Sequence, residues 1–492
     1  MADQLNADSL IEPNHLGSGV LGRLEKIAAG SLAILIIYLA ATESLAWVPF
    51  FFGVLVGLVA LLVRWPHGAL LGLLAAASIP RWFFQVSSWN AKPEHIVAAA
   101  CVGVLLFRIF ANLHIWQRLE KLDILLLAFL AANYFSSYMF SPNPASTLRW
   151  SLLQTLAASP YFLIRQLVTT KAQFDRVMNW WLWVGALEAS FGILCYLSHL
   201  FFGTDVGVTL FFYLGFIPGI YGSLWEPNIF GSYCTCFAVM FLFYYLAGER
   251  KNAWYMWGFA LSTVGLLLSL ARQAWVCLIF VAGAVVLYSL RGTKPDRMAA
   301  NGKESLTNKI QWKRLAFIGT GILIALVIAL AAMRDLSGRL ATLSVSMAAD
   351  DPTVVRRAGL IALAIDDIHQ HPMVGLGTSS FQLLYLGDDD SYQGVGQAWL
   401  GSFFFRVMHD TGIIGTVLLG WFIVNLGRRA WRILLKRRST NTGVGALLAG
   451  TVVMVIAYQL TDASTLAFTW VQVGLLATGV RIAEANSTVA LN

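Results

Sequence analysis

Long apolar runs recur along this chain, and they constrain its fold more than any other feature. An α-helix needs about 20 apolar residues to cross the hydrocarbon core of a bilayer. Such runs lie at 27–43, 46–63, 68–85, 94–111, 120–139, 149–168, 177–200, 227–247, 253–271, 273–290, 314–333, 402–426, 443–461 and 465–482. Because 58% of the residues are hydrophobic and only 12% are charged, a soluble fold could not cover this much apolar surface. The sequence therefore predicts an all-α, polytopic transmembrane helical bundle with about 12–14 spans.

The distribution of Lys and Arg predicts how these helices are oriented. With the N-terminus in the cytoplasm, 25 of the 34 Lys and Arg residues fall on the cytoplasmic side and nine on the outer side. Cytoplasmic loops of membrane proteins carry such an excess of positive charge. We therefore expect a multi-pass protein of the cytoplasmic (inner) membrane with both termini in the cytoplasm. The outer set includes Arg272, Arg356, Arg357 and Arg406.

Two long connections divide the chain. Residues 291–313 form a basic linker that we expect to be flexible and cytoplasmic, whereas residues 334–401 form a large periplasmic loop with eight Asp and four Arg. Within that loop, Asp351-Pro352 is a helix-start signal, and apolar residues at helical spacing predict an amphipathic helix over 352–370 that Pro372 ends. The expected organisation is a cytoplasmic tail at 1–26, helices 1–11 within 27–333, the periplasmic loop at 334–401, helices 12–14 within 402–482 and a cytoplasmic tail at 483–492.

Several functional classes leave no pattern in the sequence. The five cysteines lie in apolar segments and indicate buried free thiols, not a secreted disulfide scaffold or a zinc site. The net charge of +8 comes with the cytoplasmic loops, and no basic stripe with interleaved aromatic residues indicates nucleic-acid binding. We find no metal-ligand constellation and no Walker loop, so we expect no metal, ATP or other cofactor. The acidic run at 388–390 favours a solvated turn over a cation site.

Ionisable residues also lie inside the predicted helices. Arg406, His409 and Asp410 are spaced i, i+3 and i+4, so they share one helix face. An unpaired charge in the membrane costs roughly 2.5–3.5 kcal/mol. The cluster is therefore either an Arg406–Asp410 ion pair or a catalytic site in which His409 or Asp410 takes a proton from a substrate as general base. Glu188, midway along its span, predicts a protonated or hydrogen-bonded carboxyl that pairs helices or contributes to function.

Four segments share an order and spacing with one protein family. They are Gly222-Ser-Leu-Trp-Glu226-Pro-Asn228-Ile-Phe-Gly231; Ser269-Leu-Ala-Arg272-Gln-Ala-Trp275; Arg357 with the later His371-Pro372-Met-Val-Gly375-Leu-Gly377 and Phe381; and Asp410-Thr-Gly412-Ile-Ile-Gly415. Arg357 lies fifteen residues before Pro372. Across residues 220–425 this set resembles the O-antigen ligase and O-antigen polymerase superfamily, whose members handle polyprenyl-diphosphate-linked glycans outside the cytoplasmic membrane.

The resemblance implies glycosyl transfer from an undecaprenyl-diphosphate-linked glycan to a glycan or lipid-core acceptor, at an active site that faces the periplasm. It also implies membrane lipid and other polysaccharide assembly proteins as partners. Negative charge builds on the leaving diphosphate, and the planar fork of Arg suits phosphate oxygens. Catalytic roles fall on Arg272, Arg357 and Asp410 by this resemblance. His409, beside Asp410, is a candidate catalytic residue through the shared helix face; it either replaces a histidine that family ligases carry elsewhere or has no catalytic role. Contacts to the diphosphate or glycan fall on Arg356, Arg406, Glu226, Asn228, Gly375 and Gly377.

Other interpretations of the same residues stay open. Arg272 is also typical of an interfacial Arg that snorkels, Arg357 of a salt bridge with a loop Asp, and Glu226 of an ion pair with Arg272. The Gly375-x-Gly377 pattern fits a simple turn as well as a ligand contact. Family ligases carry a His-Asn pair about nine residues before the acidic position, where this chain has Gly401. Ligase and polymerase therefore both remain candidates.

A different functional class is the main alternative. Buried ionisable residues such as Glu188 also occur in secondary transporters and lipid-linked glycan flippases. The two halves of this chain show no mirrored broken helices, and the large outer loop favours a surface enzyme. A purely structural membrane partner would not explain why arginines gather on the outer side.

Overall fold

A computed structural model describes residues 66–80, 84–86, 89–110, 116–211, 217–224, 226–247, 252–291, 352–386, 400–435 and 441–489. The chain forms two compact units, Met1–Leu70 with Ala100–His114 and Leu71–Ala99 with Ile115–Asn492. The described residues of the first unit are 66–70 and 100–110. The side-chain contacts and the candidate site below belong to the second unit.

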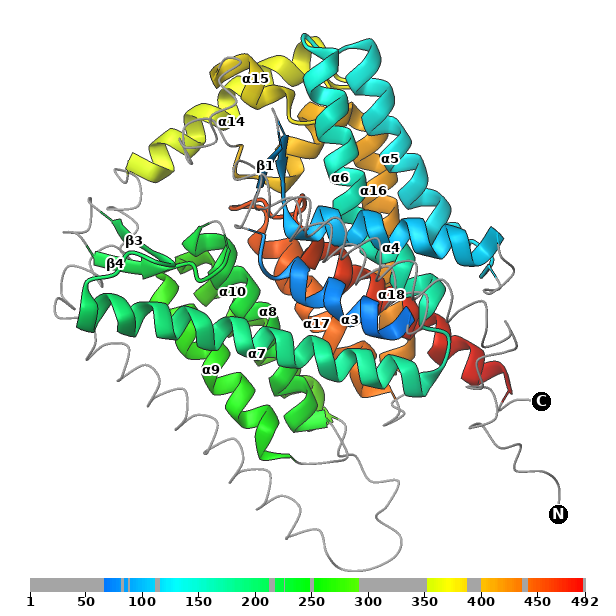
Figure 1. The fold of residues 1–492 in the computed structure, drawn as a ribbon, viewed down its shortest axis with the longest axis vertical. Coiled ribbons are helices and arrows are strands. Elements are labelled where there is room, and N and C mark those ends of the chain that lie inside the picture. Colours follow the sequence, from blue (N-terminus) through cyan, green and yellow to red (C-terminus); the bar gives the residue numbers. More distant parts are fainter. Residues whose placement is uncertain are drawn as a thin grey trace, which may run out of the picture. The chain divides into compact units, whose positions relative to one another are not determined.

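Helices dominate the described residues (Figure 1). They are α3 (Pro66–Ala77), α4 (Pro93–Phe110), α5 (Lys121–Met139), α6 (Pro144–Leu167), α7 (Lys171–Phe202), α8 (Pro227–Ala247), α9 (Ala253–Ser269), α10 (Arg272–Arg291), α14 (Pro352–Gln370), α15 (Ser380–Leu386), α16 (Phe403–Leu435), α17 (Thr442–Ala457) and α18 (Ala467–Val489). Two short antiparallel hairpins interrupt them: β1 (Phe84–Val86) with β2 (Trp89–Ala91), and β3 (Val208–Phe211) with β4 (Ile217–Ile220). The helical bundle is confirmed, with these hairpins as additions.

Each described apolar run from 94–111 onward contains a helix, but several helix ends differ from the expected ones: α6 and α7 begin earlier, α16 and α18 end later, and α17 ends earlier. The short helix α15 was not expected. One run needs a larger correction. The run 68–85 was expected to be one span, but α3 ends at Ala77 and strand β1 begins at Phe84. Pro80 explains the stop, because a proline disfavours the α conformation of the residue before it. The runs 27–43, 46–63 and 314–333, the linker after Arg291 and the acidic run 388–390 lie outside the described residues.

Six described helices are long and apolar enough to cross a membrane: α4, α5, α7, α8, α10 and α16. Helices α9 and α17 are apolar but shorter. These helices identify a multi-pass membrane protein. The total of about 12–14 spans stays a prediction.

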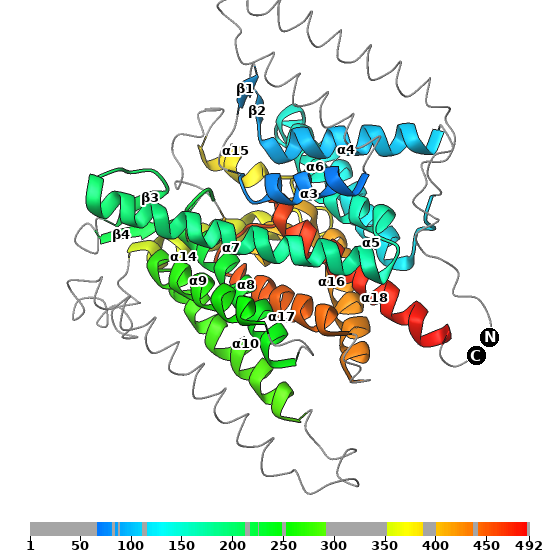
Figure 2. The ribbon, with the colours of Figure 1, turned by 60° about the horizontal axis from the view of Figure 1, so that its bottom comes forward.

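Helix α8 is the buried centre of one group of helices, where it packs against α7, α9, α10 and α17 (Figure 2). Its side chains Phe230, Tyr233, Phe237 and Phe241 are fully buried. Glycines let the neighbouring helix approach: a Cβ at Gly185 of α7 would lie 2.1 Å from the Phe237 ring. Small residues at helix contacts allow such close packing in membrane bundles.

A second group contains α5, α6, α16 and α18, and ion pairs connect them at one end. Buried Arg165 of α6 contacts both carboxylate oxygens of Asp123 at 2.9 Å and Glu120 at 3.2 Å. Arg429 of α16 contacts Glu120 at 2.8 Å and also pairs with Glu484 of α18. We call these five residues the basal ion cluster. The Arg165–Asp123 pair is buried and therefore costly to break, because its loss would leave an unpaired charge behind, whereas Glu120, Arg429 and Glu484 are partly exposed.

Low pH should weaken the stabilising contribution of Glu120 to this cluster. Burial by itself raises the pKa of Glu120, but Arg165 and Arg429 outweigh burial and hold the pKa below its ordinary value. A lowered folded-state pKa contributes stability above the unfolded-state pKa, and this contribution is lost as the pH falls through the folded-state pKa. We therefore expect Glu120→Gln to lower stability by about 1 kcal/mol at neutral pH, with the difference from wild type vanishing in acid.

Thermal melts of the purified protein in detergent, recorded across the acidic range and at neutral pH, measure this effect. Asp175→Asn is the control, because its pair with Lys171 is exposed at the surface. A difference between Glu120→Gln and wild type that stays constant with pH would contradict the assignment.

Candidate functional site

Helix α16 is interrupted at Gly412, and the interruption is the centre of the candidate site. Gly412 has φ 62° and ψ −163°, which no helical residue adopts. The amides and carbonyls around this break would lose their helical partners, and the segment that follows α14 replaces them. The replacing bonds are Leu376 N to His409 O (2.9 Å), Gly377 N to Asp410 O (2.9 Å), Ile413 N to Pro372 O (2.8 Å) and Ile414 N to Met373 O (3.2 Å).

Glycines are required where these two backbones meet. Gly375 has φ 76°, and a Cβ there would lie 2.5 Å from the carbonyl oxygen of His409. A Cβ at Gly412 would lie 2.4 Å from the carbonyl carbon of Met373. The amides of Gly375 and Gly377 donate to the carbonyls of His371 and Asp410. The predicted turn is confirmed, while substrate contact by Gly375 and Gly377 stays a prediction.

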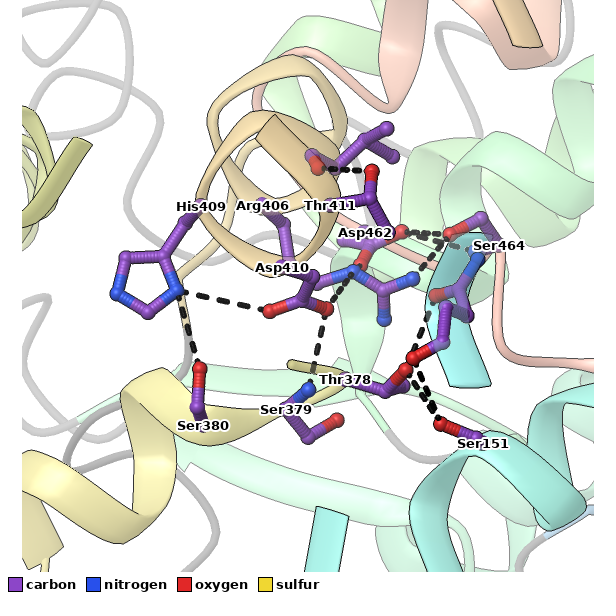
Figure 3. Close-up of polar contacts among 12 residues, drawn as sticks. Ser151, Thr378, Ser379, Ser380, Arg406, His409, Asp410, Thr411, Asp462 and Ser464 are labelled. Atoms are coloured by element: carbon purple, nitrogen blue, oxygen red, sulfur yellow. Dashed lines mark hydrogen bonds and ion pairs between the residues drawn. The ribbon is translucent and has the colours of Figure 1, made fainter. Parts of the chain in front are cut away.

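His409 lies in the last turn before the break, and its side chain has no exposed surface. Its Nε2 is hydrogen-bonded to Oδ2 of Asp367 in α14 at 3.1 Å. Its Nδ1 lies 3.4 Å from Oγ of Ser380 and 3.6 Å from Oδ1 of Asp410 (Figure 3). The edge of the Phe381 ring packs against the imidazole. Both ring nitrogens are thus engaged, and two carboxylates hold the imidazole in place.

Asp410 connects the helix break to the segment before α15. The backbone amide of Ser379 donates to Asp410 Oδ2 at 3.1 Å (Figure 3). Oγ of Ser136 in α5 donates to the Asp410 carbonyl at 2.8 Å. Ser379 has φ 59°, a left-handed conformation that is uncommon for a residue with a side chain. Backbone strain of this kind concentrates at functional sites.

Arg406 is closely neutralised from another part of the chain. Its Nε lies 2.7 Å from Oδ2 of Asp462, in the connection between α17 and α18, and 4.0 Å from Oδ2 of Asp410. Its Nη2 donates to Oγ of Ser464, which itself bonds to Asp462. The nearest acidic partner is therefore Asp462 and not Asp410, the partner that the helical spacing favoured. Contact of Arg406 with substrate stays a prediction.

Hydroxyl groups secure the site to the α5–α6 hairpin. Oγ1 of Thr378 lies 2.8 Å from Oγ of Ser151 and donates to Oδ1 of Asn133 at 3.0 Å. Oγ of Ser137 accepts from the Thr378 amide at 3.0 Å and lies 2.9 Å from Ser151. All four side chains are buried. Because every member has a partner, the network holds the Thr378-Ser379-Ser380 segment in one position.

The first and second motif segments meet each other and connect to the Arg406 cluster. Oδ1 of Asn228 accepts from Nε2 of Gln273, the neighbour of Arg272, at 2.8 Å. Oε1 of Glu226 accepts from Oγ1 of Thr461, which precedes Asp462, at 2.7 Å. Glu226 thus bonds to Thr461, whereas the sequence offered Arg272 or a sugar hydroxyl as its partner.

The two candidate catalytic arginines with described side chains lie on α10 and α14. Arg272 is the first residue of α10, two residues after Leu270, the left-handed residue that caps α9. Arg357 is half-buried on α14, and its Nε lies 3.8 Å from the position of a Cβ at Gly401, next to the Leu460 carbonyl. The side chain of Arg356 lies outside the described residues. Their phosphate-binding roles stay predictions.

Glu188 has a structural partner in the described chain. Its Oε1 accepts from the amide of Ser223 at 2.8 Å, and its Oε2 accepts from the Ser223 hydroxyl at 2.7 Å. The carboxyl thereby holds the start of the first motif segment against α7. The expectation of a hydrogen-bonded carboxyl is confirmed.

Tyr385 of α15 forms a hydrogen bond to Asp367, the residue that also contacts His409. Its hydroxyl donates to Asp367 Oδ2 at 3.0 Å. Partial burial and the hydrogen bond to the Asp367 carboxylate raise the pKa of Tyr385 to about 12. The phenol therefore keeps its proton and remains a donor at physiological pH.

Several residues of the site escaped the sequence analysis. They are Asp367, Thr378, Ser379, Ser380, Tyr385, Asp462 and Ser464. Asp462 carried a usable signal, because it is an isolated acid between the apolar runs 443–461 and 465–482. The prediction of orientation used Lys and Arg alone, so it did not draw on this acid. The hydroxyl run 378–380 directly after the Gly-x-Gly turn was a second signal. Asp367 had none, since acids are common on the polar face of an amphipathic helix.

Metal ligation has no support from side-chain placement within the described ranges. No group of three or more His, Cys, Asp or Glu side chains there has a metal-binding arrangement. All five cysteines are buried free thiols, as expected.

No protein-family model matches the chain, and no curated protein matches it.

Proposed function

We propose that this chain is a membrane glycosyltransferase of the O-antigen ligase or polymerase type. It transfers or polymerises an undecaprenyl-diphosphate-linked saccharide in surface polysaccharide biosynthesis. The observation that carries the proposal is that the four motif segments connect to one another. The first meets the second through Asn228 and Gln273, and the third meets the fourth through Gly377 and Asp410. Thr461 and Asp462 lie between these two pairs, since Thr461 bonds to Glu226 and Asp462 bonds to Arg406.

The position of the site along the bundle supports an outer-face location. The nineteen residues of α5 rise about 28 Å, close to the thickness of a bilayer core. Asn133 and Ser137, near the end of α5, contact the site, whereas the basal ion cluster lies at its start. Arg165 and Arg429 lie at that basal end, which the positive-inside rule assigns to the cytoplasm. The site then faces the periplasm.

The reaction needs two kinds of group, and the chain supplies both. The leaving diphosphate needs fixed positive charge and hydrogen-bond donors, which Arg272 and Arg357 provide. The acceptor hydroxyl needs a group that removes its proton. The imidazole of His409 and the neighbouring carboxylates of Asp367 and Asp410 are groups of this kind. The lipid tail of the donor stays in the bilayer during transfer.

Deletion of the gene, with complementation by the wild-type gene, tests the proposal through gel analysis of surface glycan. A single repeat unit left on the acceptor indicates a polymerase, and polymer left on the lipid carrier indicates a ligase. Loss of released exopolysaccharide indicates a capsule-type polymerase. Unchanged surface glycan would overturn the proposal and favour a transporter of another substrate.

A further inference from the structure

The polar groups around His409 differ in their access to an acceptor. The His409 side chain is 0% exposed and that of Asp410 is 3% exposed, whereas that of Asp367 is 15% exposed. An acceptor hydroxyl must come within hydrogen-bond distance of the group that takes its proton. Of these three side chains, Asp367 has the largest exposed fraction and is the one that an acceptor can reach, whereas His409 is covered.

The two carboxylate oxygens of Asp367 have different surroundings. Oδ2 receives both the Tyr385 hydroxyl at 3.0 Å and Nε2 of His409 at 3.1 Å. Oδ1 receives no hydrogen bond from any residue that the structure describes. The carboxylate is thus held firmly through one oxygen while the other is available to a ligand.

We propose that Asp367 is the general base of the transfer reaction and that His409 and Tyr385 are its positioning residues. This inference rests on the proposed glycosyltransferase function and names the group that activates the acceptor. The acceptor oxygen forms a bond to the anomeric carbon of the donor sugar as the bond from that carbon to the diphosphate oxygen breaks. The acceptor proton passes to the Asp367 carboxylate, and the electron pair of the broken bond leaves with the diphosphate.

The surrounding groups explain why a carboxylate can serve here. Two donors on Oδ2 fix its rotamer, which reduces the cost of orienting it in the transition state. Asp410 lies on the opposite side of the imidazole, 3.6 Å from Nδ1, so the histidine is held between two acids. Phe381 packs against both the imidazole and the Tyr385 ring and shields this arrangement on its apolar side.

The neighbouring residue provides a matched control. Asp366 carries the same carboxylate one position earlier on α14, is exposed and forms no described hydrogen bond. Asp367→Asn keeps an oxygen that can accept from His409 and Tyr385 but removes the ability to take a proton. We expect Asp367→Asn to lower the initial rate of glycan transfer by roughly 100-fold or more, and Asp366→Asn to leave it within about twofold.

A second variant separates catalysis from folding. Asp367→Ala leaves space for a small carboxylate, and the 15% exposure of the native side chain gives formate a route to the site. Membrane vesicles with the Asp367→Ala protein and endogenous lipid-linked glycan should regain transfer when sodium formate is added. Sodium chloride at the same concentration should restore nothing.

The outcomes distinguish this inference from the proposed function. Loss in Asp367→Asn with rescue of Asp367→Ala by formate supports Asp367 as the base. Full transfer in Asp367→Asn, or loss that formate does not rescue, overturns the assignment while the glycosyltransferase function stands. If vesicles with the wild-type protein form no more glycan than vesicles from the deletion strain, the proposed function itself fails.

Discussion

Replacement of Arg272 or Arg357 by Ala is expected to reduce glycan assembly to a trace, and the double replacement to abolish it. A hydrogen bond from Arg to a charged group is worth about 1.5–3 kcal/mol. If that interaction is realised on the departing diphosphate, its loss slows transfer about ten- to a hundredfold for each arginine. The readout is the amount of surface glycan in the deletion strain that carries each variant.

Two further variants control for general effects of removing an arginine. Arg176→Ala removes the same charge from an exposed position on α7 and should leave the glycan unchanged. Arg357→Lys keeps the charge but loses the bidentate fork, so it should restore only part of the activity. Full product from both Arg272→Ala and Arg357→Ala, with normal protein levels in the membrane, would show that the arginines do not act on the leaving group.

Gly412→Val is expected to prevent stable folding of the site. The residue has φ 62°, and a Cβ would lie 2.4 Å from backbone atoms of Met373 and Val374 that cannot move aside as a side chain can. Backbone strain and forced displacement together cost about 3 kcal/mol or more. The displaced segment after α14 also carries the amides that bond to the His409 and Asp410 carbonyls. Thermal melts in detergent and the yield of folded protein measure the effect.

Another glycine of the same helix supplies the control. A Cβ at Gly420 meets nothing within 4 Å, and Gly420 has helical geometry. Gly420→Ala should therefore be neutral or slightly stabilising, because Ala favours the helix by about 1 kcal/mol over Gly. Equal melting temperatures for Gly412→Val and Gly420→Ala would mean that the helix break is not essential to the fold.

Much of the fold is predictable because it depends on local patterns. The amphipathic helix expected over 352–370 appears as α14, with its start at Pro352 and its end before Pro372. Long apolar runs and proline positions are properties of neighbouring residues, so they can be read without knowing the tertiary structure. The failure at 68–85 has the same origin, since the apolar run hid the stop that Pro80 imposes.

The candidate site is less predictable because its contacts join distant segments. Helical spacing placed Arg406, His409 and Asp410 together, and it suggested an Arg406–Asp410 pair. The structure instead pairs Arg406 most closely with Asp462, more than fifty residues later, at 2.7 Å. Asp367 meets both His409 and Tyr385 only because the chain turns back at Gly375 and Gly377. No local spacing rule contains that information.

The sequence by itself determined that this chain is a helical, multi-pass membrane protein and where most of its described apolar helices lie, and it predicted which arginines are on the outer side. These follow from hydrophobicity, helix signals and charge counts, which act over a few turns at most. Only the tertiary structure decided which charges are partners and which carboxylate an acceptor can reach. Those properties depend on the distances and exposure that arise when α14, α15, α16 and the α17–α18 connection pack together.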